Sequence, residues 1–599
     1  MRLATALAVV TALAAAPAQA AVLPGQTLDG PSADILSLGD VSLAADGTGA
    51  VAYLKTAGGQ EQAFVVRRSG GAWGPPVNVS NAAQGNTDVE VEASNGGRLL
   101  VVYQTEGNDL KAKVSPGTGQ PFGAEIPLDT GINGFSSDAN DAGVGYVVAL
   151  KGTDVVGQRV TGNTAAPLGA AIATAGTNSR VVAVDGAGNA VVAYDLDDGG
   201  NTEIVARRLT GTTVGPAVEA TVPTLLGRPR VGMASNVSVA SDLAGNAWVS
   251  FREQFNYPTL LNQNRNRPLV RRLAGNTFGS ALLVDPGPTP PGEMTDAEFI
   301  RLAVAPNGAN ALASGFIQDA SVGGKPAPFG ASLTPGAASP FSLDSLSDGV
   351  ITSGNGIVNG GSGFIAYSFQ PGAAADYVLR ARLRAGTGAF GAPIPVSNPA
   401  LGNVDGAVSP FTAADASKTG VVAYKQGAAA TTRVLAATLD IPQPAAGGGG
   451  GDTTDPSISR FSLSRSTFRK GTKLPKLSAV KTGTTIRFRL SEAATVRLTF
   501  EKAAKGRRVG RSCRKPSRRN RTRKACRRYV RVKTVLTAKG KAGANKLSFQ
   551  GRLTRRRSLK TGRYRFSLRA TDVSKNVSKR TAKKRFRLLA AAKKRKAKR

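Results

Sequence analysis

The chain has 599 residues and a formal net charge of +38, with 77 Lys or Arg, 39 Asp or Glu, two Cys and no His. The absence of histidine excludes Ser-His-Asp and Cys-His catalysis and histidine-ligated metals, and two cysteines alone cannot form a four-ligand zinc site. Residues 452–599 hold 50 basic and 5 acidic residues, a net charge of +45, whereas the preceding 451 residues hold 27 and 34, a net charge of −7. Charge concentrated in this way attracts polyanions to one end of the molecule.

Residues 1–20 are predicted to be a signal peptide. Arg2 provides the positive start, residues 3–15 the apolar core, and residues 18–20 a small-x-small cleavage site before Ala21. The apolar run is shorter than the roughly 20 residues that a membrane span requires. We therefore expect a secreted, extracellular protein that is associated with the cell surface by noncovalent forces and has no transmembrane segment.

Residues 21–441 are predicted to be β-propeller repeats. A short apolar strand, a Gly/Asn turn and a second apolar strand ending in an aromatic residue recur, clearly at residues 43–53, 184–194 and 240–251. The repeat ends lie 44 to 65 residues apart, at Tyr53, Tyr103, Leu150, Tyr194, Phe251, Phe316, Tyr367 and Tyr424. This period suits a blade of four antiparallel strands, which takes about 40 to 50 residues without insertions.

A second sequence pattern follows the first and supplies two more strands per unit. Residues 65–68 precede Trp73-Gly74, and residues 205–208 precede Gly215-Pro216 in the same manner. The last unit stops after three strands near Leu439, and a strand near Val22 would complete it and close the ring. Seven or eight blades are predicted; the alternative is a string of two or three β-sandwiches, which would break the repeat register at each joint.

These repeats resemble the β-propeller repeats of secreted bacterial proteins. The turns at residues 185–190 and 242–247 are similar to the Asp-box turn of sialidase-type propellers, although the spacing from Asp to Gly differs and the usual aromatic is present only at Trp248. The resemblance implies a sialidase-like site of arginines, a tyrosine and carboxylates facing the channel, for which the residues present are Arg67, Arg207, Arg252, Arg271 and Tyr194.

The recurring aspartates are interpreted as turn residues that bond their own backbone. The acidic loop at residues 195–203 carries oxygen ligands suited to calcium, but its glycines miss the EF-hand positions. We therefore predict no metal site, no cofactor and no catalytic residue.

Residues 442–456 contain prolines and five consecutive glycines and are predicted to be a linker. Beyond it, residues 457–588 are predicted to be a basic immunoglobulin-like β-sandwich, because residues 485–490 and 564–569 alternate strictly between apolar residues and arginine. Residues 562–578 resemble the closing hairpin of bacterial immunoglobulin-like or fibronectin-type modules, with Lys575 in place of a glycine. Such modules commonly act as adhesive spacers. Residues 589–599 are predicted to be a disordered basic tail.

Cys513 and Cys526 are predicted to form a disulfide, since an exported chain meets an oxidising environment. Seven of the twelve residues between them are basic. A closed loop would hold these charges together as a polyanion-binding patch, and the alternative is a structural staple beside a solvated charge run. The predicted binding residues are Arg514, Lys515, Arg518, Arg519, Arg521, Arg523, Lys524, Arg527 and Arg528.

The sequence as a whole favours a non-enzymatic binding or adhesion protein. Its basic module would hold anionic envelope polymers or lipid headgroups, and its propeller would present a face to a ligand that the sequence does not identify. One alternative is a secreted carbohydrate-active, sialidase-like glycosidase. The other is extracellular nucleic-acid binding, which rests on charge alone because few aromatic residues interleave with the arginines.

Overall fold

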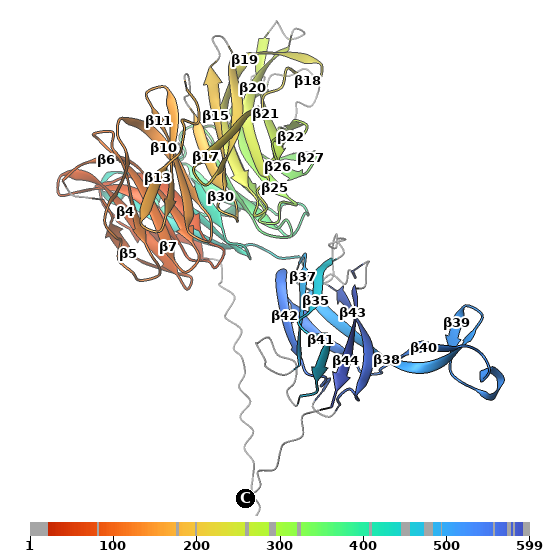
Figure 1. Cartoon of the computed structure of the whole chain (residues 1–599). Coiled ribbons are helices and arrows are strands. Elements are labelled where there is room, and N and C mark those ends of the chain that lie inside the picture. The colour runs from red at the N-terminus through yellow and green to blue at the C-terminus, as the bar shows by residue number, and fades with distance from the viewer. Residues whose placement is uncertain are drawn as a thin grey trace, which may run out of the picture. The chain divides into compact units, whose positions relative to one another are not determined.

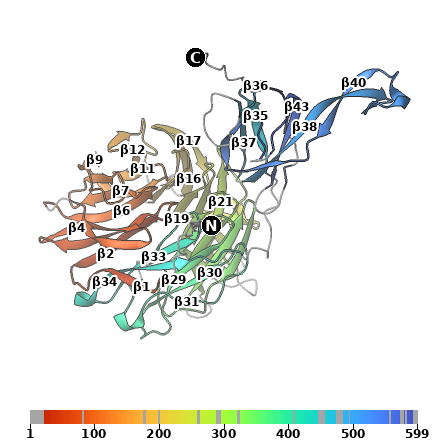
Figure 2. The same ribbon diagram turned by 90° about the horizontal axis from the view of Figure 1, so that it is seen from below.

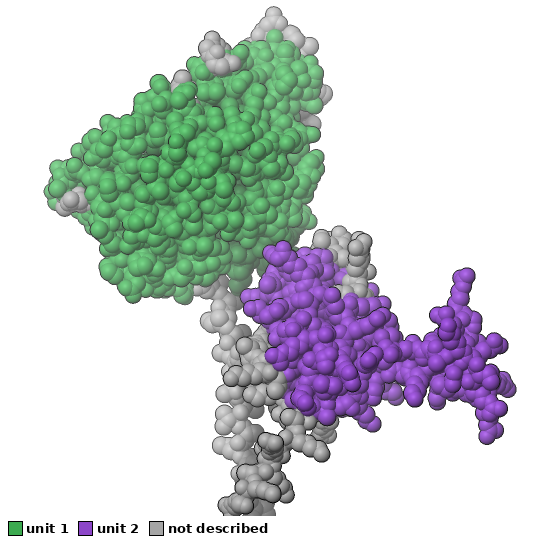
Figure 3. All heavy atoms as spheres, in the orientation of Figure 1, with its two compact units in different colours: residues 1–449 green, residues 450–599 purple. Residues whose placement is uncertain are grey.

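The chain divides into two compact units, residues 1–449 and residues 450–599 (Figure 3). The computed structural model describes residues 22–80, 83–174, 179–197, 201–257, 263–286, 295–319, 325–406, 410–444, 456–471, 483–492, 494–554, 557–571, 577–578 and 582–590. The predicted signal peptide, most of the linker and nearly all of the basic tail lie outside these ranges. Among the described residues, no helix has the length and apolar character needed to cross a bilayer.

In its described residues the first unit consists of eight antiparallel sheets that follow one another around a common centre (Figures 1 and 2). Seven sheets have four strands, and the fifth has six. The first four sheets are β2 (Ile35–Leu43), β3 (Gly49–Ala57), β4 (Gln60–Ser69) and β5 (Ala72–Asn78); β6 (Asn86–Ser94), β7 (Arg98–Thr105), β8 (Leu110–Ser115) and β9 (Ile126–Asp129); β10 (Ile132–Ala139), β11 (Val144–Lys151), β12 (Asp154–Thr161) and β13 (Thr164–Pro167); and β14 (Arg180–Val184), β15 (Ala190–Asp197), β16 (Thr202–Thr210) and β17 (Thr213–Glu219). The last four are β18 (Thr224–Leu225), β19 (Arg228–Ser241), β20 (Ala247–Tyr257), β21 (Gln263–Ala274), β22 (Thr277–Phe278) and β23 (Leu282–Leu283); β24 (Thr295–Val304), β25 (Ala311–Asp319), β26 (Lys325–Thr334) and β27 (Ala337–Ser342); β28 (Ser353–Ile357), β29 (Gly363–Phe369), β30 (Val378–Arg384) and β31 (Ile394–Pro395); and β32 (Phe411–Ala414), β33 (Thr419–Gln426), β34 (Arg433–Asp440) and β1 (Val22–Asp29).

The innermost strands form a closed ring. Strands are counted here from the centre outward, with β18 as an addition to the fifth sheet. The first strand of each sheet then contacts the first strand of the next, in the order β2, β6, β10, β14, β19, β24, β28 and β32, and β32 contacts β2. The eighth sheet is completed from the N-terminal side, where β1 pairs antiparallel with β34 and Gln26 lies opposite Ala436. The unit is therefore an eight-bladed β-propeller that shares one blade between its two ends, and the alternative of separate sandwiches was wrong.

The hydrophobic core lies between neighbouring blades. The second strand of each blade is enclosed by the blades on either side, so both of its faces are apolar and buried, as in β29, where every residue is buried. All eight repeat ends identified in the sequence lie in second strands and are buried. Tyr53 joins Val51 to Val421 and Ala436 in one cluster that seals the first blade against the last.

The second unit is a two-layer sandwich. One sheet has β35 (Ile458–Leu463), β37 (Thr484–Leu490) and β42 (Gly543–Phe549), and the other has β36 (Thr467–Arg469), β38 (Ala494–Val509), β39 (Ser512–Arg514), β40 (Ala525–Arg531), β41 (Leu536–Gly540), β43 (Gly562–Thr571) and β44 (Ala582–Leu589). The predicted alternation is present: in β37, Ile486, Phe488 and Leu490 are buried, while Arg487 and Arg489 are exposed. Three short 3₁₀ helices complete the described elements, η2 (Pro399–Leu401) and η3 (Ala429–Thr431) in the first unit and η4 (Arg518–Asn520) in the second.

Ring closure is reinforced by a polar contact at the end of β1. The carboxylate of Asp29 accepts a hydrogen bond from the Tyr53 hydroxyl at 2.5 Å and pairs with Lys55 Nζ at 2.9 Å. Burial alone would raise the pKa of Asp29, but these two hydrogen bonds and one from the Gly30 amide outweigh it and lower the pKa. The ionised carboxylate thus ties the closing strand to the first blade.

Replacing Asp29 with Ala should reduce the free energy of unfolding of the propeller by about 2 kcal/mol, because the Tyr53 hydroxyl and the Lys55 ammonium lose a charged partner. The loss should be largest near neutral pH, since a carboxylate with a lowered pKa contributes stability above its unfolded pKa and none after protonation. Chemical denaturation at pH 7 and pH 3 measures both effects. Asp34→Ala, at an exposed carboxylate bonded to Ser32, is the control and should change stability by less than about 0.5 kcal/mol.

Candidate functional site

A two-stranded arm projects from the sandwich (Figures 1 and 3). The first half of β38 pairs with β43, up to Lys502 opposite Tyr564, whereas its second half pairs with β40, from Glu501 opposite Arg531 to Arg507 opposite Ala525. An isolated two-stranded ribbon is marginally stable in water. Like charges lie directly opposite each other in this one, as Lys505 does with Arg527, and weaken it further.

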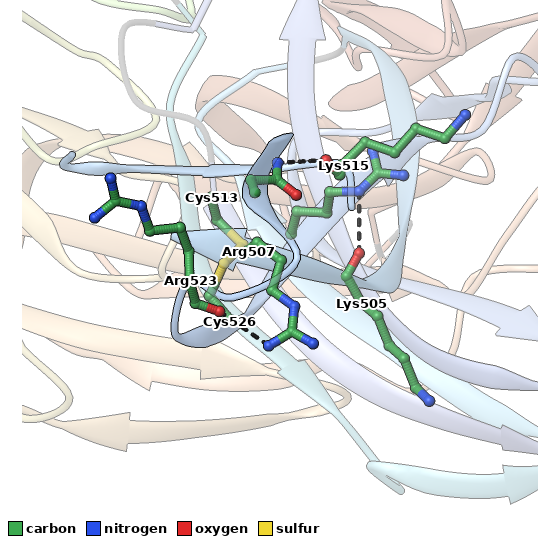
Figure 4. The surroundings of a disulfide bond; sticks show 8 residues. Lys505, Arg507, Cys513, Lys515, Arg523 and Cys526 are labelled. Carbon is green, nitrogen blue, oxygen red and sulfur yellow. Dashed lines mark hydrogen bonds between the residues drawn. A yellow bond between two sulfur atoms is a disulfide. The ribbon is translucent and has the colours of Figure 1, made fainter. Parts of the chain in front are cut away.

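A disulfide at the outer end of the arm compensates for this weakness. Cys513 and Cys526 are joined, with their Cα atoms 6.0 Å apart (Figure 4). Gly506 lies opposite Cys526 in the ribbon, and a Cβ at this position would come within 2.4 Å of Cys513 Sγ. A glycine is therefore required where β38 passes the disulfide.

The loop closed by the disulfide is organised by one buried residue. Asn520, at the end of η4, donates from Nδ2 to the Lys515 carbonyl at 3.0 Å and accepts at Oδ1 from the Ser517 amide at 2.8 Å. Arg507 Nη1 donates to the Arg523 carbonyl at 2.9 Å and holds the loop against β38 (Figure 4). Because these contacts use the amide of Asn520 and backbone carbonyls, the basic side chains of the loop stay available to solvent.

The structure places all nine predicted binding residues on this arm. Eight are exposed, and Arg528 is half-buried, with its Nε bonded to the Lys505 carbonyl at 3.2 Å. The sequence analysis did not single out Lys505 and Arg563, which line a groove of about 480 Å³ with Arg527. Lys505 of β38 lies opposite Arg527 of β40, and Arg563 comes from the start of β43.

The propeller residues considered for a sialidase-like site do not gather in the channel. Arg67 and Arg271 lie on third strands, away from the centre, where Arg67 bonds Ser115 of the next blade at 2.7 Å and Arg271 bonds the Ala220 carbonyl at 2.8 Å. Arg207 donates to the Tyr194 hydroxyl at 3.1 Å, and Arg252 bonds Ser235 at the same distance. These side chains tie strands and blades together.

The turn aspartates also have a structural role. Asp185 Oδ1 accepts from the amides of Ala187 and Asn189 at 2.8 and 2.9 Å, and Asp242 Oδ1 makes the same pair of bonds with Ala244 and Asn246. In the acidic loop at residues 195–203, Asp195 accepts from the Ser179 amide at 2.7 Å, and Asp198 lies outside the described residues. Across the described part of the chain, no group of three or more acidic or cysteine side chains is placed to hold a metal.

The central channel contains a polar cavity of about 440 Å³ that the sequence analysis did not locate. It is lined from the innermost strands by Asp40 of β2, Ser238 of β19, Arg301 of β24, Asn355 of β28 and Thr412 of β32. Burial lowers the pKa of the Arg301 guanidinium.

Next to Asp40, the channel wall is acidic. Burial raises the pKa of Asp40 to about 6 and that of Asp138 on β10 to about 7, although backbone amides bond both carboxylates. Glu90 and Glu92 on β6 have pKa values well above the ordinary value, because of burial and then the neighbouring charge of Asp40. The Ser137 hydroxyl donates within this group, 2.7 Å from Glu90 and 3.0 Å from Glu92.

No protein-family model and no curated protein matches the chain. Solved structures that it resembles include the BP39L lectin from Burkholderia pseudomallei (14% identity, 61% of this chain and 99% of that chain, TM-score 0.35) and the Hadza microbial sialidase Hz136 (10% identity, 64% and 73%, TM-score 0.32). A third is the Penicillium chrysogenum alpha-L-arabinanase (12% identity, 60% and 94%, TM-score 0.28). These are distant matches to β-propeller proteins.

The acidic wall predicts how the stability of the propeller depends on pH. Carboxyls whose folded pKa is raised favour folding below the unfolded value of about 4, and this contribution is lost as the pH rises through the folded values of about 6 and about 7. The melting temperature of the first unit should therefore be higher at pH 5 than at pH 8. In Asp40→Asn this difference should shrink, whereas the exposed Glu106→Gln control should keep it; an unchanged pH profile in Asp40→Asn would contradict the assignment.

Proposed function

We propose that the protein is a secreted, non-enzymatic binding protein of the cell surface and that its basic C-terminal unit holds anionic envelope polymers. The observation that supports this most is the arm, which presents the nine predicted basic residues on a ribbon fixed by a disulfide. An arm that projects from its domain reaches into a polymer mesh more readily than a flat sheet does. The export step rests on the predicted signal peptide, and the disulfide suits an oxidising compartment.

A bound polyanion would also stabilise the sandwich itself, because it relieves repulsion between basic side chains on the sheets. Several cross-strand neighbours carry like charges, among them Arg487 opposite Lys546, Arg497 opposite Arg569 and Arg563 opposite Arg587. Like charges in such positions destabilise a sheet. A bound polyanion neutralises them, so the melting temperature of the second unit should rise when the polymer binds.

The affinity would come from many weak contacts. Each Lys or Arg near an anionic surface contributes on the order of 1 kcal/mol, and salt screens the attraction over about 10 Å. A dozen contacts would retain the protein without a covalent anchor. On isolated envelope material the protein should be released by rising NaCl, and retention that ignores ionic strength would reject the proposal.

The glycosidase alternative has less support from the geometry. Hydrolysis of a glycosidic bond requires two carboxyl groups on either side of the bond. Among the described residues, Asp40 is the one carboxylate that lines the channel cavity. Incubating the protein with a glycan panel separates the alternatives, because turnover abolished by Asp40→Asn would favour the enzyme.

The position of the charge, and not only its amount, should determine polyanion binding. Changing Arg518, Arg519, Arg521 and Arg523 to Ala should reduce the slope of log K against log [NaCl] for heparin by roughly 0.7 per lost contact, the value found for flexible polyanions. A control that changes Arg487, Arg489, Lys539 and Lys546 on the sandwich removes the same charge from exposed positions. Equal losses of affinity in the two variants would contradict a role for the arm.

The disulfide should matter because it preorganises these charges. Replacing Cys513 and Cys526 with Ser leaves the net charge unchanged but releases a loop whose closure constrains the chain by roughly 3 kcal/mol. Heparin affinity at fixed salt should fall several-fold, while the melting temperature of the sandwich body should change little. Affinity equal to that of the parent protein would identify the disulfide as a structural staple only.

A further inference from the structure

The channel cavity has opposite charges on its two sides. In a ring of eight, the fourth blade along lies opposite, so β24, which carries Arg301, faces β6, which carries Glu90 and Glu92, across the centre. Asp40, on the next strand to β6, lines the same cavity as Arg301. The cavity of about 440 Å³ is therefore lined by one guanidinium, Arg301, and one carboxyl group, Asp40, and the further carboxyl groups of β6 lie beyond Asp40 on the channel wall.

Arg301 is a cation without a counterion. In the part of the chain that the structure describes, no carboxylate, hydroxyl or carbonyl is bonded to its guanidinium; its carbonyl accepts from Asn355 Nδ2 at 3.0 Å. Arg301 is exposed to the channel, and an unpaired guanidinium that faces a cavity can form bidentate hydrogen bonds with a carboxylate. The anions on the opposite wall do not reach it, so the position favours an anionic group from outside the chain.

Asn355 provides an acceptor beside this cation. Its side chain is 6% exposed, and its Nδ2 donates both to the Arg301 carbonyl and to Ser314 Oγ at 2.8 Å, which fixes the amide. Its Oδ1 carries no hydrogen bond to any described residue, and the residue lines the cavity. This oxygen is therefore free to accept a hydrogen bond from a donor that enters the cavity.

The opposite side determines what else the ligand carries. The titratable groups there are Asp40, Asp88, Glu90, Glu92 and Asp138, with the guanidinium of Arg180 on β14 beside them. As these carboxyls ionise, they repel a second negative charge on a ligand and attract an ammonium group. A polyanion of the kind that the arm holds would be excluded from the cavity.

We propose that the central cavity binds a small zwitterion, whose carboxylate pairs with Arg301 and whose ammonium group lies toward Asp40. The ligand class follows from the two opposed walls and is independent of polyanion binding by the second unit. Because the ligand has no net charge, the basic arm does not compete for it.

A chain-length series tests the proposal and measures the span between the two walls. Isothermal titration of the full-length protein with glycine, β-alanine, 4-aminobutyrate, 5-aminopentanoate and 6-aminohexanoate should give saturable binding with an optimum at one length. Hexanoate and hexylammonium, which each carry one of the two charges, should bind at least tenfold more weakly than the best zwitterion. Equal binding of either monofunctional compound, or no saturable binding in the series, would overturn the proposal.

Variants test which residue contacts each end of the ligand. Arg301→Gln should weaken the best zwitterion at least tenfold, and Asp40→Asn should narrow the difference between that zwitterion and hexanoate by removing the attraction for ammonium. Arg433→Gln is the matched control, since that guanidinium bonds the Thr431 carbonyl at an exposed position, and it should bind as the parent protein does. Circular dichroism melting confirms that each variant is folded, and unchanged affinity in a folded Arg301→Gln variant would refute the assignment.

The pH dependence of binding provides a second readout that a merely structural role would not give. The ammonium group is attracted by ionised carboxylates, so the affinity for the zwitterion should rise from pH 5 to pH 8 as Asp40 and Asp138 ionise. The affinity of hexanoate should fall or stay constant over the same range. A zwitterion that binds more tightly at pH 5 than at pH 8 would contradict the placement of its ammonium group.

Discussion

The propeller depends on one set of backbone hydrogen bonds, those that join β1 to β34. Without them the eighth sheet has three strands, and the outer edge of β34 has no partner. The inner strands make a complete circle where β32 contacts β2, and polar residues from blades far apart in the sequence come to face one cavity. The channel is thus a product of closure.

The two units treat charge in opposite ways. In the propeller, arginines such as Arg67 and Arg208 join neighbouring blades, since each donates a hydrogen bond to a group of the next blade. In the second unit, arginines face solvent on strands whose other face is a conventional core of Phe, Leu and Val. The sandwich tolerates the repulsion between these arginines because its apolar core holds the two sheets together. The ribbon of the arm has little core and is held by the disulfide instead.

The architecture could be predicted from the sequence because its signals are local and repeated. Buried aromatic residues such as Tyr53 and Tyr367 lie in the second strands, and the Gly/Asn turns before them mark the hairpins. These two signals allowed the repeat period and the four strands per blade to be predicted. The alternation of Phe and Arg around residue 487 likewise identified the sandwich. The disulfide pair could be predicted because two cysteines allow one pairing.

The channel could not be predicted, because what makes it a site is the meeting of single residues from different blades. Arg301 and Asn355 do not lie in a recognisable motif. The sequence around Arg67 and Arg271 likewise does not show that these two residues lie on third strands, away from the channel. One local signal was present: residues 88–92 alternate acidic residues with Val, a pattern unsuited to an ordinary core strand and suited to an innermost strand that faces a polar channel.

Because β1 is the first strand to be synthesised and β34 the last of the propeller, roughly 400 residues separate the two halves of the final sheet, a separation that slows folding. A chain that ends before β34 cannot complete the eighth sheet, so closure of the ring has to wait for the last strand of the propeller.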